Sequence, residues 1–183
     1  MSGRSISSLT NPTVKAVRAL HLRKEREESG LFLAEGLKIV VDAVELGHAP
    51  FGWRGVLDSA GHPLLKRSAE AAVRAGGEVI EVTREVLEKV SRRDNPQAVI
   101  AVFSQLFSPL LSLDSSAASC WVALQAVRDP GNLGTIIRTA DAAGCGGVIL
   151  VGDCCDPYSV EAVRATMGSI FAVNIAKASV DEF

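Results

Sequence analysis

The chain has 183 residues, of which 48% are hydrophobic, and its formal net charge is −2. This length, with a mean hydropathy of +0.23, indicates a globular protein with a sizeable core and excludes an intrinsically disordered chain. The near-neutral charge argues against a broadly basic nucleic-acid-binding surface. No apolar run approaches the roughly 20 residues of a membrane helix, and the amino terminus lacks the apolar segment of a signal peptide, so we expect a cytoplasmic protein without a membrane partner.

Positive charge is concentrated in the first two thirds of the chain. Residues 1–120 hold 15 Lys and Arg against 14 Asp and Glu, whereas residues 121–183 hold 4 against 7. A solvated surface of mixed charge explains these totals. If the protein does contact nucleic acid, a few specific arginines must carry the contact. The four cysteines form no Cys-x-x-Cys pair and the three histidines are scattered, so we expect no metal site.

Predicted helices and strands alternate over the first hundred residues. Asn11-Pro12 is a strong helix start, because Asn caps a helix and Pro fits its first position; this helix is expected to run toward Glu28. The other predicted elements are strands at 31–34, 55–58, 78–82 and 98–105 and helices at 36–46, 63–75 and 83–90. Such alternation predicts an α/β fold with helices on both faces of a mixed or parallel sheet.

A serine-rich segment with few charges follows and is typical of a linker. We therefore assign residues 1–106 to a first domain, 107–119 to the linker and 120–183 to a second domain. The second domain is predicted to contain strands at 122–127, 147–152 and 170–175 and helices at 132–143 and 159–166. This order predicts a right-handed βαβ series.

The most informative stretch is residues 124–140, which indicates an apolar strand, a polar turn and a helix. Residues 129–132 supply the turn, and Asn132 is expected to cap the helix. Arg138 then lies among small and β-branched residues, so we expect a largely buried charge. A buried guanidinium needs a partner. That partner is either a structural carboxylate, from Asp141 or Asp129, or an anion of a substrate.

The pattern Asp129-Pro130-x-Asn132-x-Gly134-x-x-x-Arg138-x-Ala140-x-Ala142-x-Gly144 resembles the first signature of the SpoU/TrmH family, which are RNA ribose 2′-O-methyltransferases of the SPOUT class. Downstream, Asp156–Ser159 and Arg164–Ser169 resemble the family's next segment. Upstream, Phe32–Lys38 and Asn95–Ala98 resemble its L30e-like substrate-binding domain, although the family usually has glycine at the position of Ala98. The resemblance covers nearly the whole chain, and the Asn-Gly-Arg spacing is its most specific part.

The resemblance implies an L30e-like α/β amino-terminal domain and the first part of a trefoil-knot SPOUT α/β methyltransferase domain. Family members continue with two further motifs that build most of the S-adenosylmethionine pocket, and this chain ends at Phe183 before either. We therefore expect the front part of an enzyme, with its cofactor-binding residues beyond Phe183 and poor cofactor binding by this part alone. A homodimer is implied for the full-length protein.

The implied reaction is methyl transfer from S-adenosylmethionine to a ribose 2′-hydroxyl of rRNA or tRNA, without a metal. Arg138 is expected to clamp the phosphate beside the target ribose, because its high pKa makes it a poor base. Asn132 would orient Arg138 or the ribose, and Gly134 would allow a close backbone approach. The expected RNA contacts are Arg92 and Arg93 in a predicted loop, together with Glu35, Arg128 and Arg164.

Two other functions stay open from the sequence. The chain could be a non-catalytic RNA-binding protein or an inactive fragment of such an enzyme. It could also be a nucleotide-binding Rossmann domain, because the run from Gly131 to Gly134 follows a strand and opens a helix; it lacks the third glycine of that fingerprint. A KH domain is excluded, since its G-x-x-G loop joins two helices.

Overall fold

A computed structural model describes residues 4–50, 52–56, 63–74 and 76–183. The chain divides into two compact units, Met1–Ser104 and Gln105–Phe183. Of the strand predicted at 55–58, the last two residues lie outside the described residues. Within the described part of the chain, no helix combines the length and apolar character that a bilayer crossing requires.

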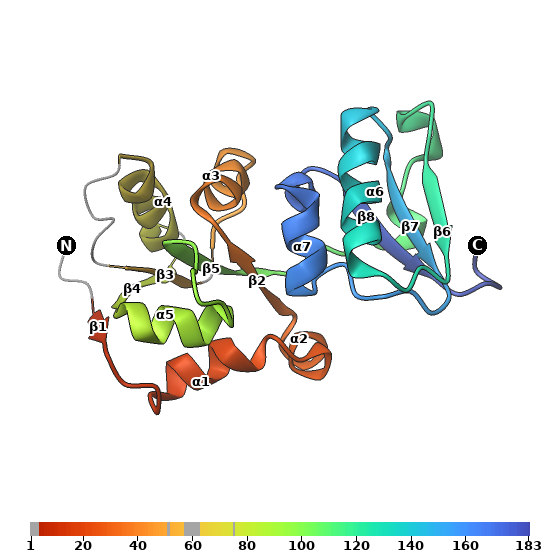
Figure 1. Cartoon of the computed structure of the whole chain (residues 1–183). Helices are drawn as coiled ribbons and strands as arrows, with labels where there is room; N and C mark the ends of the chain where they lie inside the picture. The colour runs from red at the N-terminus through yellow and green to blue at the C-terminus, as the bar shows by residue number, and fades with distance from the viewer. Residues whose placement is uncertain (1–3, 51, 57–62, 75) are drawn as a thin grey trace. The chain divides into compact units, whose positions relative to one another are not determined.

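The first unit is a five-stranded mixed sheet with helices on both faces, as the alternating pattern predicts. Its elements are β1 (Arg4–Ile6), α1 (Pro12–Ala19), α2 (Arg23–Ser29), β2 (Leu31–Glu35), α3 (Leu37–Glu45), β3 (Gly52–Val56), α4 (Pro63–Arg74), β4 (Glu78–Val82), α5 (Arg84–Ser91) and β5 (Val99–Ser104). The strand order is β1-β4-β3-β5-β2. β1, β4 and β3 run parallel, and β5 is antiparallel to both of its neighbours. α3 and α4 cover one face, and α1 and α5 cover the other (Figure 1).

The single helix predicted from Asn11 toward Glu28 is two helices in the structure. α1 ends at Ala19, and α2 begins at Arg23. Arg26 is only 3% exposed, and its Nη1 donates to the carbonyl oxygen of Leu20 at 2.8 Å. This carbonyl lies at the carboxyl end of α1, where a positive charge is favoured by the helix dipole. The basic segment of α2 therefore contains a structural arginine that holds the α1–α2 junction.

The second unit is a parallel three-stranded sheet in the order β6-β7-β8. Its elements are β6 (Val122–Gln125), α6 (Pro130–Ala142), β7 (Gly147–Val151), α7 (Val160–Thr166) and β8 (Asn174–Ala178), with short 3₁₀ turns η2 (Leu110–Ser112), η3 (Ser115–Ala117) and η4 (Ser169–Phe171). The strand predicted at 170–175 starts later, at Asn174, because Met167 and Gly168 adopt left-handed conformations that lead into η4. The βαβ order is as predicted.

α6 and α7 pack against each other unusually closely at Gly134. A Cβ atom there would lie 2.4 Å from the carbonyl oxygen of Ala162 and 2.6 Å from Cβ of Ala165, both of which belong to α7. Only glycine permits this approach. The close backbone approach expected at Gly134 is therefore made to a neighbouring helix, and its contribution to a site is to fix the position of α6.

The segment predicted to be a linker, residues 107–119, belongs to the second unit, and its first residues are packed there. The backbone N–H of Leu106 donates to the hydroxyl of fully buried Tyr158 at 2.7 Å. The ring of Phe107 meets Tyr158 edge to face with a centroid distance of 4.9 Å, and the N–H of Ser108 donates to the carbonyl of Ile175 at 2.8 Å. Low charge and many serines suggest an unattached segment, whereas the aromatic pair anchors its first residues.

Candidate functional site

The loop and helix start of the second unit are built by Asp129 and Pro130. Asp129 is the N-cap of α6, and its Oδ1 accepts the backbone N–H of Asn132 at 2.6 Å. Pro130 occupies the first helical position, where its missing N–H costs nothing. The prediction that Asn132 caps this helix is wrong; it lies inside the first turn, and its side chain is exposed.

Arg138 is exposed, contrary to the burial expected from its neighbours in the sequence. The reason is the phase of the helix. One face of α6 packs inward through Leu133, Gly134, Ile137 and Ala140. Arg138 lies about 100° further around the axis than Ile137, so its side chain leaves that face. Apolar neighbours in the sequence therefore do not surround its charge.

Neither structural partner considered for Arg138 engages it. Among the described residues, the Arg138 guanidinium makes no hydrogen bond or ion pair, with Asp129 and Asp141 included. The exposed face around it carries Asp141 and the small side chains of Thr135, Thr139 and Ala142. The hydroxyl of Thr135 donates to the carbonyl of Gly131, and that of Thr139 to the carbonyl of Thr135, both at 2.9 Å. Arg138 is thus the one long, cationic side chain on this face.

A second arginine lies in the loop that joins β6 to α6. The Nη1 of Arg128 pairs with the Oδ2 of Asp153, which follows β7. The carboxyl ends of β6 and β7, which are parallel neighbours, meet at the same edge of the sheet, and ligands of α/β proteins bind at such an edge. Sequence reasoning missed Asp153, because nothing in its local sequence signals a partner 25 residues away.

The two loops at this sheet edge are tied together by backbone and thiol contacts. The N–H of Cys155 donates to the carbonyl of Val127 at 2.7 Å, and the Sγ of Cys154 donates to the carbonyl of Leu124 at 3.3 Å. Ala126 has a φ of +55°, which is costly for a residue with a Cβ. The contacts between the two loops therefore stabilise the strained backbone at Ala126 and fix the position of Arg128.

The same edge is rich in carboxylates. Burial raises the pKa of the Cys155 thiol, and the neighbouring Cys154 and the carboxylates of Asp129 and Asp156 raise it further. The Cys155 thiol therefore stays protonated at neutral pH. Arg128 is paired with Asp153 at this edge, and an incoming anion would have to compete with that carboxylate.

The two segments of the first unit that resemble the substrate-binding domain lie side by side. The Oε1 of Glu35 accepts the backbone N–H of Gln97 at 3.1 Å, and the N–H of Gly36 donates to the carbonyl of Val99 at 2.9 Å. Gly36 has a φ of +116°, which favours glycine at this turn out of β2. At least one Glu35 oxygen therefore serves to hold the 95–99 segment in place.

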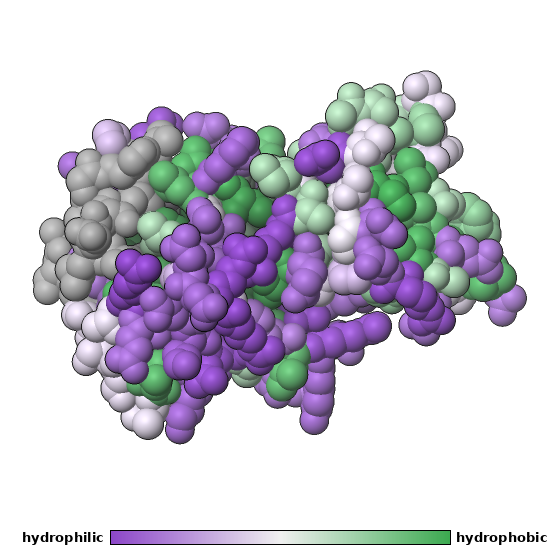
Figure 2. All heavy atoms as spheres, in the orientation of Figure 1, coloured by the Kyte–Doolittle hydropathy of each residue, from purple (hydrophilic) through white to green (hydrophobic). Residues whose placement is uncertain are grey.

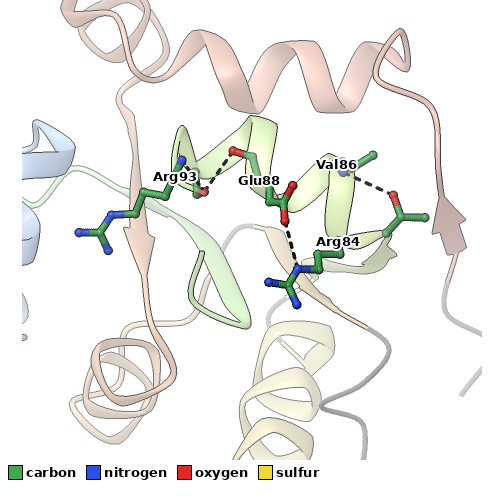
Figure 3. A network of polar contacts seen from close by, with 6 residues as sticks. Arg84, Val86, Glu88 and Arg93 are labelled. Carbon is green, nitrogen blue, oxygen red and sulfur yellow. Dashed lines mark hydrogen bonds and ion pairs between the residues drawn. The ribbon is translucent and has the colours of Figure 1, made fainter. Parts of the chain in front are cut away.

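Arg92 and Arg93 form an exposed pair at the carboxyl end of α5. Arg92 ends the helix in a left-handed conformation with a φ of +57°. The backbone N–H of Arg93 donates to the Oγ of Ser91 at 3.2 Å, while the Nε of Arg84 pairs with Glu88 at 3.0 Å. Figure 3 shows the guanidinium of Arg93 extending away from this network. Backbone contacts thus fix the turn and leave the arginine head available for an anion.

The structure brings some of the predicted site residues together and keeps others apart. Arg128 and Asn132 flank the start of α6, whereas Arg138 lies about 9 Å further along the axis and roughly 120° around it from Asn132. Arg164 is half-buried in the last turn of α7. Glu35, Arg92 and Arg93 belong to the other unit.

Two family descriptions match the chain, one for each unit. Residues 11–101 match the MRM3-like substrate binding domain, and residues 119–183 match the SpoU rRNA Methylase family. Among curated proteins, an uncharacterized tRNA/rRNA methyltransferase of Synechocystis is 33% identical over 90% of this chain and 59% of its own length. The 23S rRNA (guanosine(2553)-2′-O)-methyltransferase RlmP of Bacillus subtilis is 29% identical over 98% of this chain and 67% of its own length. The chain thus spans about three fifths to two thirds of these relatives.

Solved structures of methyltransferases also superpose on this chain. An rRNA methyltransferase from Sinorhizobium meliloti with bound AdoMet superposes with a TM-score of 0.91 at 49% identity, covering 98% of this chain and 66% of that one. A second structure of an rRNA methyltransferase from this organism has a TM-score of 0.89 at 47% identity, covering 100% of this chain and 68% of that one. The SpoU methyltransferase AviRb from Streptomyces viridochromogenes, with AdoMet, has a TM-score of 0.80 at 27% identity, covering 92% and 63%.

Proposed function

The chain belongs to the SpoU rRNA methylase family, and from this premise we propose that its full-length protein transfers a methyl group from S-adenosylmethionine to a ribose 2′-hydroxyl of RNA. The RlmP relative is named as a 2′-O-methyltransferase of 23S rRNA, and one of the two Sinorhizobium structures and the AviRb structure hold AdoMet. These names support ribosomal RNA as the substrate, with transfer RNA as the alternative.

The observation that carries this proposal is the exposed Arg138, which has no ion-pair or hydrogen-bond partner among the described residues. A guanidinium remains charged at any working pH and binds phosphate oxygens through two parallel hydrogen bonds. Arg138 would therefore clamp the phosphate beside the target ribose and align its 2′-hydroxyl. Alignment is the main task of a protein in an in-line displacement. Asn132, on the preceding turns, would orient the ribose.

The cofactor would supply an electrophilic methyl carbon on a sulfonium. The loop at the carboxyl end of β6, residues 126–132, presents exposed backbone and polar side chains at the edge of a parallel sheet. That arrangement fits one wall of a cofactor site. We assign no further residue of this chain to the cofactor.

RNA positioning is the role we propose for the remaining arginines. Arg92 and Arg93 are exposed at a well-held turn, and Arg128 lies at the edge of the sheet beside Asn132. Glu35 would act indirectly, by holding the segment that contains Gln97. Arg164 is half-buried, so only part of its side chain would be available to RNA.

We also propose a homodimer of the full-length protein in the cytoplasm. The stripe of small residues on α6 would let a second surface approach closely, and over α6 Figure 2 shows mostly pale, weakly polar side chains. The second unit also exposes several large hydrophobic side chains, namely Leu111, Met167, Val180 and Phe183. In the proposed dimer the second subunit would cover side chains of this kind.

Methyl transfer from labelled S-adenosylmethionine to unmodified ribosomal RNA tests the proposal directly. With the full-length protein, we expect the label in 2′-O-methylated nucleosides after digestion of the RNA. Label on a base would make the reaction assignment wrong. RNA binding without any transfer to ribosomal or transfer RNA would favour the non-catalytic RNA-binding alternative.

A further inference from the structure

The ion pair between Arg128 and Asp153 lies at the same edge of the sheet, and the proposed reaction gives the pair no role. Each side chain is 70% exposed, and the pair joins the loops that follow β6 and β7. An ion pair this open to water is screened and contributes little to folding stability. Its exposure also means that an RNA strand can approach Arg128 from solution.

The two loops that carry the pair are nevertheless held in defined positions. The backbone contact between Cys155 and Val127, at 2.7 Å, brings the two loops together on either side of it. The left-handed Ala126 directs the chain into Arg128. The guanidinium of Arg128 is thus held in a defined position but is bound only weakly by its carboxylate partner. Such a group can exchange one anionic partner for another.

We propose that Asp153 determines the specificity of the RNA site by competing with RNA: its carboxylate neutralises Arg128 in the free protein, and an RNA phosphate displaces it. This inference rests on the proposed RNA function. A phosphate oxygen forms the same two-pronged contact with a guanidinium as a carboxylate does, and an RNA strand brings several phosphates at once. A single small anion lacks that advantage, so Asp153 keeps such anions from Arg128.

Other carboxylates near these loops indicate that Asp153 competes with RNA for Arg128 and does not assist RNA binding. Asp129 and Asp156 lie near the same loops, close enough to act on Cys155. When RNA takes Arg128, the carboxylate of Asp153 is left beside a phosphate, and the two repel each other. Removing that carboxylate should therefore strengthen RNA binding, whereas a residue that merely oriented Arg128 would weaken binding when removed.

The test is a double-mutant cycle on the full-length protein, with unmodified in vitro transcribed 23S rRNA as the probe in filter binding. We expect Asp153→Asn to lower the Kd roughly two- to fivefold, the range that an exposed ion pair supports. Asp153→Glu should keep the wild-type value. Arg128→Ala should raise the Kd and reduce the salt dependence by about one phosphate contact. In the Arg128→Ala background, Asp153→Asn should have no effect beyond that of a charge control.

Glu161→Gln provides the charge control. Glu161 is exposed in the first turn of α7, and the substitution removes one negative charge from the same unit. Steady-state kinetics add a readout that a structural role would not give: Asp153→Asn should lower the KM for RNA and leave kcat unchanged. Inorganic phosphate should inhibit RNA binding by Asp153→Asn more strongly than by the wild type.

Each result decides the matter. Weaker binding by Asp153→Asn would mean that Asp153 orients Arg128, and the competition would be wrong. Equal tightening in the Arg128→Ala background, or by Glu161→Gln, would reduce the effect to general electrostatics and overturn the inference. If the wild type methylates RNA and the cycle shows no coupling, only this inference fails. If the cycle holds and no methyl transfer occurs, the proposed reaction fails instead.

Discussion

Two arginines in two regions, Arg26 at the α1–α2 junction and Arg138 on α6, have environments that are the reverse of those their local sequences suggest. Arg26 lies in a run of charged residues and is buried against the carbonyl of Leu20. Arg138 lies among apolar residues and is exposed. The composition of the flanking residues is therefore a poor guide to the burial of a charge. Burial is determined by which face of a helix packs inward and by where one helix ends and the next begins.

Arg26 has a structural role, whereas we assign Arg138 a functional one. Arg26 donates to a carbonyl at the end of a helix, where folding itself benefits from the contact. Arg138 has no such contact among the described residues, so folding gives no reason for an arginine there. The following variants test this separation, from the largest expected effect to the smallest.

Arg138→Ala in the full-length protein should lower the rate of methyl transfer by roughly 10²–10³-fold, the loss typical of one preorganised donor. The folding free energy should change by no more than about 0.5 kcal/mol, since the side chain is exposed. Arg138→Lys should restore the charge but only part of the rate, because lysine lacks the planar fork.

Single-turnover methyl transfer and thermal denaturation, measured side by side, check this expectation. Arg18→Ala is the matched control, because Arg18 is an exposed arginine on α1. A variant of Arg138 that melts much earlier and keeps its rate per folded molecule would make Arg138 a structural residue.

Arg26→Ala should show the opposite pattern, with a loss of about 2–4 kcal/mol of unfolding free energy. The change removes the donor to Leu20 and leaves a cavity around the former side chain. Chemical denaturation of the first unit measures the loss. Arg23→Ala, which removes an exposed arginine that pairs with Glu27 at 2.7 Å, should cost less than about 1 kcal/mol. Equal losses for the two variants would refute the assignment of Arg26 as the structural arginine.

Gly134→Ala tests what holds α6, and with it Arg138, in position. The added Cβ would lie 2.4 Å from the carbonyl of Ala162, so α6 and α7 must separate, at a cost of about 1–3 kcal/mol. Gly131→Ala is the control on the same helix, because a Cβ there meets only the side chain of Asp129, at 3.2 Å. Equal stability of the two variants would mean that the helix crossing adapts without cost.

Tyr158→Phe should have the smallest effect, about 1 kcal/mol at neutral pH, because the N–H of Leu106 loses its acceptor. Burial raises the pKa of Tyr158 above its ordinary value of 10.0. The folded state therefore favours the neutral phenol. The contribution of Tyr158 to the free energy of unfolding is complete below about pH 10 and is lost as the pH rises further. Denaturation from pH 8 to 11 should show a steeper loss for the wild type than for the variant, and parallel curves would contradict this.

The sequence by itself determined the architecture of the two units and proposed where the site lies. Alternating periodicities and turn residues predicted the α/β order of both units, and Asn11 was correctly expected to cap α1. The spacing from Asn132 to Arg138 pointed to the helix that carries the unpartnered arginine. These features are local, because capping and periodicity depend on residues within a few turns of one another.

Only the tertiary structure decided which charges are buried and which groups meet. The exposure of Arg138 depends on the face that α6 turns toward its sheet and α7, and the burial of Arg26 depends on a break between two helices. The pairing of Arg128 with Asp153 and the approach at Gly134 join segments that are far apart in the sequence. Such contacts are set by the packing of whole elements, which local sequence does not encode.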